Sequence, residues 1–362
     1  RTGSPLLGQR LRLPALGATV YENRFSVTDL PLLGDHRIFG EVVVSGACYL
    51  SMLLAAVAKA RKSAACVVRD VGFVQPLVIA AGQAVTVQAV LTPEGDRTAL
   101  RLVSFADGDD DDGGGDDPVV STHVEAMVHA GELPPAAASA QPRHAGWERC
   151  AEEIGAERFY RTQAERHIGL GPSYRWIDAI RLGKGEAVCA IRVPASLGGL
   201  ESRPLHPGLL DAAFGLLLAA APLADGDTWL PFGIEAVRVH ADPDPDHCWA
   251  HLVLRPAGGV DRVAADVQVF DRNDRLVLEF IGFEGRRARS RDVLRHLTAG
   301  TEGRLYAKDW RPLAPAAAAS APPSRWLLLA DSQGVAEHLA RPLQADGARC
   351  VLAFAGTAFA AT

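Results

Sequence analysis

The sequence lacks several features that mark large classes of proteins. No uninterrupted apolar run reaches the ~18–20 residues that a membrane-spanning helix requires. The first residues, RTGSPLLGQRLRLP, also lack the basic, apolar and small-residue order of a signal peptide. These absences predict a soluble, cytoplasmic protein without a membrane partner.

Cysteine pairs and an excess of positive charge are absent as well. The six cysteines lie far apart and never form a CxxC pair, so neither a disulfide framework nor a zinc site is indicated. We expect them to be buried as small apolar residues. The net charge is −6, and this mild acidity argues against a nucleic-acid partner, which normally binds to a clustered basic face.

The sequence does contain enough apolar residues to bury a core. Of its 362 residues, 48% are hydrophobic and 22% are charged, so disorder along the whole chain is excluded. A typical domain has ~100–200 residues, and the length therefore predicts two or three units. Stretches rich in proline and alanine mark the boundaries between them. The predicted organisation is an N-terminal unit (1–132), a linker (133–146), a second unit (147–288), a further linker (289–324) and the start of an α/β domain (325–362).

The first two units share one order of signals, in which strand-like segments surround a single apolar helix. The helices are expected over Gly46–Ala60 and Pro207–Ala221, and both should be buried because they are apolar on nearly all sides. Alternating segments predict the strands, among them QAVTVQAVL and TALRLVSFA in the first unit and CWAHLVLRP and VAADVQVFD in the second. This repetition predicts an α+β fold built from two copies of one small unit.

Two other segments have simpler interpretations. Residues 325–362 show a strand, a helix and a strand, which is typical of the beginning of an α/β domain. The acidic insert DGDDDDGGGDDP (107–118) lacks the Asp-x-Asp-x-Asp-Gly register and the closing Glu of a calcium loop. It is therefore predicted to be a solvated loop.

A titratable residue accompanies each apolar helix. His36 precedes the first helix, and Asp211 lies inside the second, flanked by leucine, alanine and phenylalanine. Burial of an unpaired carboxylate is costly, so the pKa of Asp211 should rise, as a general acid near neutral pH requires. His36, with an ordinary pKa near ~6.5, suits a general base. Either residue alone could be structural, but their comparable places in two similar units make them candidates for one shared site.

The residues around this pair resemble a known family. HRIFGEVVVSG (36–46) is similar to the HxxxGxxxxP motif of polyketide synthase dehydratase domains, and HPGLLD (206–211) is similar to their HPxxxD motif. Further similarities are PLLGQRL near the start, HIGLGPSY (167–174) against GYxYGPxF, LPFG (230–233) against LPFS, and the closing LYAKDWRPL. The resemblance covers about residues 4–312. The strand-helix-strand segment that follows (325–362) resembles the beginning of the structural part of a ketoreductase domain.

The resemblance implies a double hot-dog fold and hydro-lyase activity on a β-hydroxyacyl chain. That chain would be carried as a thioester on the phosphopantetheine of an acyl carrier protein, and the domain would need no cofactor or metal. His36 would remove the α-proton, and Asp211 would protonate the departing β-hydroxyl. Backbone N–H groups near Gly46, at the start of the first helix, are plausible donors to the thioester carbonyl. The expected substrate-binding residues are Gly40, Ser45, Gly46, Leu170, Pro172, Tyr174, Pro207 and Phe232.

Four residues depart from the family's motifs. Ser45 replaces the proline of the first motif, while Leu170 and Tyr174 replace a tyrosine and a phenylalanine of GYxYGPxF. Gly215 stands four residues after Asp211, where the family often has a glutamine or histidine that would hydrogen-bond the acid. These changes suggest that the same pocket also moves the new double bond from the α,β to the β,γ position. Leu170 would leave room for the γ-carbon, and the Tyr174 hydroxyl would steady the dienolate or relay a proton.

Other functions remain open at this point. Some relatives with altered pocket residues close a pyran ring by oxa-Michael addition. The domain could also be a catalytically silent spacer, but the presence of both His36 and Asp211 argues against that. A stand-alone hot-dog thioesterase would need only a carboxylate that activates water. The expected partners are an acyl carrier protein, neighbouring domains of the same synthase and a second copy in a homodimer.

Overall fold

The computed structural model describes residues 4–13, 15–106, 120–132, 143–197, 205–221, 223, 227–243, 247–256, 260–289, 325–330 and 334–354. The chain divides into two compact units, Arg1–Glu302 and Gly303–Thr362. The predicted acidic loop (107–118), most of the first linker (133–146) and nearly all of the second linker (289–324) lie outside the described residues.

The first half of the larger unit is an antiparallel sheet around one helix, as predicted. The helix is α1 (Gly46–Arg61). The strands β7 (Val85–Glu94) and β8 (Arg97–Ala106) form the expected hairpin, pairing along their whole length. The strands of this half-sheet are β1 (Gln9–Leu11), β2 (Thr19–Phe25), β5 (Cys66–Phe73), β7 (Val85–Glu94), β8 (Arg97–Ala106) and β9 (Ser121–His129).

Helix α1 has clear start and stop signals. The Ser45 hydroxyl accepts a hydrogen bond from the Cys48 N–H, which satisfies one of the free donors of the first turn. Lys62 ends the helix in the left-handed conformation, with its N–H bonded to the Ala58 carbonyl. Ten residues of α1 are buried, so the helix is the core of its half rather than a surface element.

The second half repeats this plan around α4 (Pro207–Ala220). Two helices that the sequence analysis did not predict precede it, α2 (Arg143–Arg149) and α3 (Ala156–Glu165). The strands of this half-sheet are β10 (Glu152–Gly155), β12 (Ile177–Leu182), β13 (Glu186–Ile191), β14 (Asp227–Val239), β15 (Cys248–Arg255), β16 (Arg262–Phe270) and β17 (Leu276–Arg289). Two short turns of 3-10 helix also occur, η2 (Pro172–Tyr174) and η3 (Ala195–Leu197).

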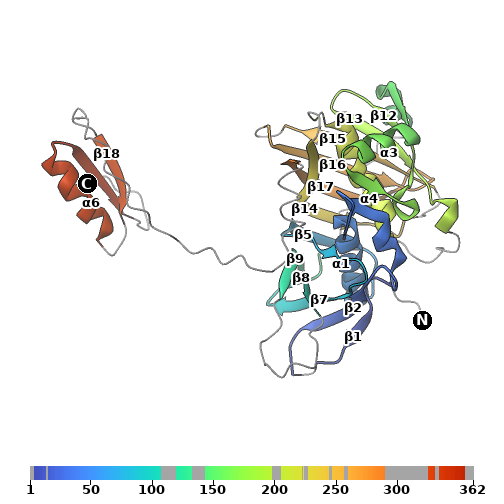
Figure 1. Cartoon of the computed structure of the whole chain (residues 1–362), viewed down its shortest axis with the longest axis horizontal. Coiled ribbons are helices and arrows are strands. Elements are labelled where there is room, and N and C mark those ends of the chain that lie inside the picture. Colours follow the sequence, from blue (N-terminus) through green and yellow to red (C-terminus); the bar gives the residue numbers. More distant parts are fainter. Residues whose placement is uncertain are drawn as a thin grey trace. The chain divides into compact units, whose positions relative to one another are not determined.

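The two half-sheets join edge to edge. β5 of the first half pairs with β14 of the second, and the result is one sheet of 13 strands in the order β1-β2-β7-β8-β9-β5-β14-β17-β16-β15-β13-β12-β10. Figure 1 shows β5 and β14 side by side at the middle of this sheet, with α1 in one half and α4 in the other. α1 and α4 also contact each other. The larger unit therefore consists of two fused units of similar design, as the sequence predicts.

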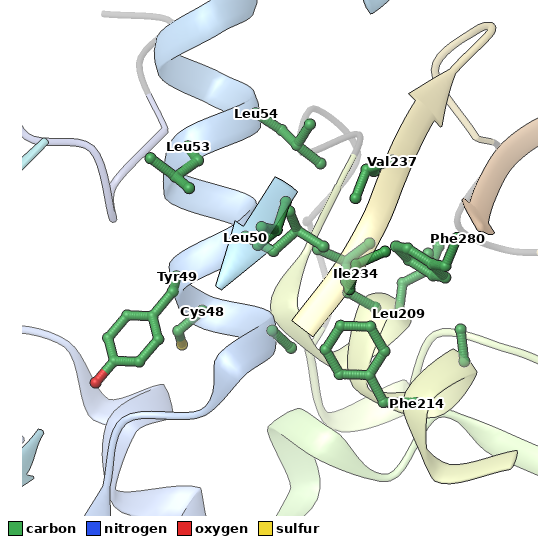
Figure 2. Packing of buried hydrophobic residues seen from close by; sticks show 14 of the residues in the cluster. Cys48, Tyr49, Leu50, Leu53, Leu54, Leu209, Phe214, Ile234, Val237 and Phe280 are labelled. Carbon is green, nitrogen blue, oxygen red and sulfur yellow. The ribbon is translucent and has the colours of Figure 1, made fainter. Parts of the chain in front are cut away.

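The hydrophobic core runs across this junction. Figure 2 shows Leu50 of α1 beside Ile234 of β14, with Leu209 and Phe214 of α4 nearby. Phe214 also packs on Phe280 of β17, with ring centroids 5.2 Å apart. Full burial of one such side chain contributes about 1.5–3 kcal/mol. Because residues of both halves share this cluster, the packing of each half depends on the other.

A second, smaller sheet connects the halves at the end where α1 begins. Its strand order is β11-β3-β4-β6, with β11 (Ile168–Leu170), β3 (His36–Ile38), β4 (Glu41–Val43) and β6 (Val78–Ile79). β11 comes from the second half and the other three strands from the first. Its antiparallel register sets Leu170 opposite His36.

The smaller unit has the predicted order of strand, helix and strand. β18 (Arg325–Ala330) and β19 (Arg349–Phe354) are parallel and are connected through α6 (Val335–Ala345). That this segment begins a following ketoreductase domain stays a prediction. None of the helices in the described parts of the chain is long and apolar enough to cross a membrane.

Candidate active site

His36 stands at the start of β3, directly after the 3-10 turn η1 (Pro31–Asp35). Its side chain is buried, and its Nδ1 atom lies 2.7 Å from the carbonyl oxygen of Val43. A carbonyl can only accept, so Nδ1 carries the hydrogen and donates it, which leaves Nε2 as an acceptor with a free lone pair. Burial lowers the pKa of His36 to about 4, although the bond to Val43 acts in the opposite direction. At neutral pH the imidazole is therefore an uncharged base.

Asp211 lies in α4, and its environment shifts its pKa the other way. Burial raises the pKa of this carboxyl from 3.8 to about 7. Among the residues that the structure describes, none donates a hydrogen bond to it, so nothing nearby favours the charged form. A substantial fraction of Asp211 is consequently protonated near neutral pH and can act as an acid.

The start of α4 explains the other residues of the HPxxxD motif. The His206 ring accepts the Gly208 N–H at 3.0 Å and caps the helix, and Pro207 occupies the first turn. Gly208 has no room for a side chain, because a Cβ atom there would overlap the Trp176 indole. The motif thus fixes the start of α4, and with it the place on the helix from which the Asp211 side chain projects.

His36 and Asp211 line the same cavity, which has a volume of about 200 Å³. The cavity is walled by residues of both halves and is mainly apolar, with Phe73 from the first half and Phe159 and Phe214 from the second. Low polarity in this space explains why the pKa of His36 falls and that of Asp211 rises. The structure therefore brings the predicted base and the predicted acid to one apolar pocket.

Two of the residues that depart from the family's motifs contact each other. The Tyr174 hydroxyl lies 3.0 Å from the Ser45 Oγ atom and 3.0 Å from the Cys48 Sγ atom. The Tyr174 ring packs on the His36 imidazole, with centroids 5.3 Å apart. The serine and the tyrosine thus form a buried polar link between the start of α1 and η2, beside the base.

Asp35 holds the same turn in place. Its carboxylate accepts the Ser173 N–H at 2.9 Å, and its carbonyl accepts the Gly171 N–H at 2.7 Å. Position 171 must be glycine because a Cβ atom there would overlap the Asp35 side chain. The residue before His36 therefore attaches η2, and with it Tyr174, to the base.

Gly46 also lines the cavity, at the first position of α1. The first-turn N–H groups of Cys48 and Tyr49 bond to Ser45, whereas those of Gly46 and Ala47 have no acceptor among the described residues. A helix start with free N–H groups can bind a carbonyl oxygen that gains negative charge.

The predicted substrate-binding residues divide into two groups. Those that line the cavity with His36 and Asp211 are Ser45, Gly46, Leu170 and Tyr174. Four others do not belong to its wall. Gly40 and Pro172 are exposed, Pro207 is buried in the first turn of α4, and Phe232 lies under the Arg286 guanidinium in a neighbouring groove. Their roles stay predictions.

Sequence reasoning missed Tyr160, which lines the cavity from α3. It missed the whole helix because α3 is short and mostly polar, with only three buried residues, Phe159, Tyr160 and Gln163. The adjacent pair of aromatic residues in a polar segment was the available signal.

The described residues contain no group of three or more histidine, cysteine or acidic side chains that could hold a metal ion. None of the described cysteines forms a disulfide, and all except Cys350 are buried, as predicted.

Comparisons with known proteins agree with the motifs. One family model, described as the polyketide synthase dehydratase domain, matches residues 4–105. A second, described as the polyketide synthase dehydratase N-terminal domain, matches residues 137–295.

Solved structures of such domains share the fold. The crystal structure of an inactive mutant of the CurJ dehydratase in complex with compound 21 is 31% identical, with a TM-score of 0.71. The match covers 80% of this chain and 98% of that one. The dehydratase domain from the CurF module of curacin polyketide synthase has the same fold at 24% identity and a TM-score of 0.69, covering 79% and 99% of the two chains. The predicted double hot-dog fold is confirmed.

Curated relatives are much longer proteins. Mycoketide-CoA synthase of Mycobacterium tuberculosis is 27% identical over 335 residues, which are 91% of this chain and 8% of that protein. Polyketide synthase ThaG of Burkholderia thailandensis is 30% identical over 337 residues, 88% of this chain and 6% of that protein. The chain thus spans less than a tenth of these two relatives. Its motifs, its fold and its match over nearly all of a solved relative show that the chain belongs to the polyketide synthase dehydratase domain family.

Proposed function

We propose that this domain removes water from a β-hydroxyacyl chain bound as a thioester to an acyl carrier protein. The observation that carries the proposal is the cavity shared by an uncharged imidazole and a carboxyl group with a raised pKa. An elimination needs a base and an acid at the same time, and the two groups are tuned for these roles at neutral pH.

In the proposed reaction, Nε2 of His36 takes the proton from the α-carbon. The electrons of that C–H bond form the α,β double bond as the bond from the β-carbon to oxygen breaks. Asp211 gives its proton to the departing oxygen, which leaves as water. The free N–H of Gly46 stabilises the charge that develops on the thioester carbonyl. His36 ends the reaction protonated and Asp211 ends it ionised. A proton that passes from His36 to Asp211, directly or through solvent, restores both groups.

Relatives support this assignment. The CurJ dehydratase structure is that of an inactive mutant in which a phenylalanine replaces a histidine. The curated relatives are polyketide synthases, so an acyl carrier protein and the neighbouring domains of such a synthase are the partners that we propose. The absence of a cofactor requirement, the cytoplasmic location and the homodimer stay predictions from the sequence.

A shift of the new double bond to the β,γ position is our second candidate. Leu170 favours it, because this apolar side chain lines the cavity and lies opposite His36 in the sheet register. His36 is therefore next to an apolar side chain, beside which the γ-carbon of the substrate can lie. The Tyr174 hydroxyl is already engaged with Ser45 and Cys48, so we assign the shift to His36 and Leu170 rather than to a relay through Tyr174. No feature of the described cavity favours pyran-ring closure.

The test is an incubation of the protein with a short β-hydroxyacyl thioester that carries γ-protons, in deuterated buffer. NMR would locate the double bond and the deuterium. Dehydration predicts an α,β-unsaturated thioester, and the shift predicts β,γ-olefin with deuterium at the α-carbon. A free acid and thiol as the only products would instead indicate a thioesterase and would contradict the proposal.

The variant Leu170→Tyr tests the second candidate alone. It should suppress the exchange of γ-protons more than dehydration, because the tyrosine ring and hydroxyl fill the space beside His36. Formation of α,β-olefin only, with no deuterium at the γ-carbon in the unmodified protein, would eliminate the shift and leave the dehydration intact.

A further inference from the structure

The carboxyl group of Asp211 has no hydrogen-bond donor on its own helix. Its carboxyl accepts no hydrogen bond from any described residue, although an acid that gives up its proton in an apolar cavity benefits from a nearby donor. The next position on the same helical face is residue 215, four residues along, and it is a glycine without a side chain to donate.

Gly215 allows another element to come close at this point. A Cβ atom at position 215 would lie 3.2 Å from the Phe159 ring, which is tighter than ordinary contact, and 3.4 Å from Ile177. The Phe159 side chain of α3 therefore occupies the space that a side chain of α4 would otherwise fill. Phe159, Gly215 and Asp211 all line the cavity.

Tyr160 follows Phe159 and brings a hydroxyl to the same wall. Its ring packs edge-on against Phe159, with centroids 5.2 Å apart, and it lines the cavity with Asp211. The Ile177 N–H donates to its oxygen at 2.9 Å. No described residue accepts the hydroxyl's own proton, so this buried group has one hydrogen bond still to give.

We propose that Tyr160 is a further catalytic residue, whose hydroxyl donates a hydrogen bond to the β-oxygen of the substrate while Asp211 protonates that oxygen. This inference rests on the proposed dehydration. The β-oxygen has two lone pairs, so it can receive the Asp211 proton on one and the Tyr160 hydrogen bond on the other. Tyr160 keeps its proton throughout, and the leaving group departs as water held by its hydroxyl.

The pKa of Tyr160 agrees with a role as a hydrogen-bond donor. Burial, and to a smaller extent the charge of Asp211, raises the pKa of the Tyr160 phenol far above neutral. The hydroxyl therefore stays protonated at every pH at which the domain would work, and it acts as a donor rather than as a second base.

The experiment compares Tyr160→Phe with a control, Tyr21→Phe. Tyr21 is a buried tyrosine of β2 in the other half, and it is not among the residues that line the cavity. With a β-hydroxyacyl thioester, Tyr160→Phe should lower kcat by about tenfold or more and leave KM within about twofold. The control should keep kcat within about threefold of the unmodified protein, whatever its KM. Thermal unfolding would show that both variants are folded.

A second substrate separates a chemical role from a structural one. Chloride leaves without a proton, so elimination from a β-chloroacyl thioester requires the base but no donor to oxygen. Tyr160→Phe should leave that elimination within about twofold of the unmodified protein. An equal loss on both substrates, an equal loss of kcat in the control, or an unchanged kcat in Tyr160→Phe would overturn the inference. If the unmodified protein does not dehydrate the first substrate, the proposed function itself fails.

Discussion

At the scale of single residues, one physical cause tunes both members of the proposed pair. Removal from water disfavours whichever form is charged, so it lowers the pKa of a histidine and raises that of an aspartic acid. The same apolar cavity thus yields a neutral base at His36 and a protonated acid at Asp211. In a solvent-filled cleft an aspartic acid, with an ordinary pKa near ~3.9, would be ionised at neutral pH and could not act as the acid.

These two pKa values predict the pH dependence of the reaction. For the free protein, kcat/KM should rise as pH increases through about 4, where His36 loses its proton, and fall as pH increases through about 7, where Asp211 ionises. Steady-state rates with a short thioester in overlapping buffers would measure this profile. Activity that keeps rising above about pH 8 would contradict the assignment of Asp211 as the acid.

Much of the site could be predicted at this scale, because chemistry-bearing residues in apolar surroundings stand out in the sequence. His36 and Asp211 were found in that way, and the structure brings both to one cavity. The aromatic pair Phe159 and Tyr160 is visible in the sequence, but its place at the cavity could not be predicted, because that place depends on how closely α3 packs against Gly215. Sequence periodicity carries no information on that distance.

At the scale of elements, local capping and turn contacts position the site. Ser45 caps the start of α1 and also contacts Tyr174 of η2, so one side chain connects a helix start in the first half with a turn in the second. The helices α1 and α4 were predicted almost to the residue, since serine, histidine and proline mark their starts. The pairing of β11 with β3 was not predictable, because strands this short have no distinctive alternation.

Ser45→Ala should lower the free energy of unfolding by about 1–2 kcal/mol, since it removes the cap of α1 and leaves the buried Tyr174 hydroxyl with fewer partners. Urea unfolding would measure the change. The control is Ser63→Ala beyond the other end of α1, where the serine is exposed, and its effect should stay within about 0.5 kcal/mol. Equal effects of the two changes would show that the Ser45 contacts contribute nothing.

At the scale of the whole larger unit, the two halves form one structure. They share a continuous sheet through β5 and β14, a core across that junction and the small sheet that contains His36. The sequence predicted the duplication but not this edge-to-edge joining, because β5 and β14 are far apart in the chain and nothing in either strand identifies the other as its partner. A site made from both halves follows directly from that arrangement.

The first half alone, residues 1–132, should therefore not fold cooperatively. Separation would expose the edge of β5 and the apolar residues that α1 packs against α4. Circular dichroism in increasing urea would show a broad transition for this fragment and a sharp one for residues 1–289. A sharp transition in the fragment would mean that the halves are independent domains.

The most direct test of the central claim is the rate of dehydration in two single variants, His36→Ala and Asp211→Asn, each shown to be folded. General acid or base catalysis typically contributes about 100-fold to 10,000-fold, so each variant should lose at least about 100-fold in kcat on a β-hydroxyacyl thioester. Dehydration that survives either substitution at a rate near that of the unmodified protein would contradict the roles given to this base and this acid.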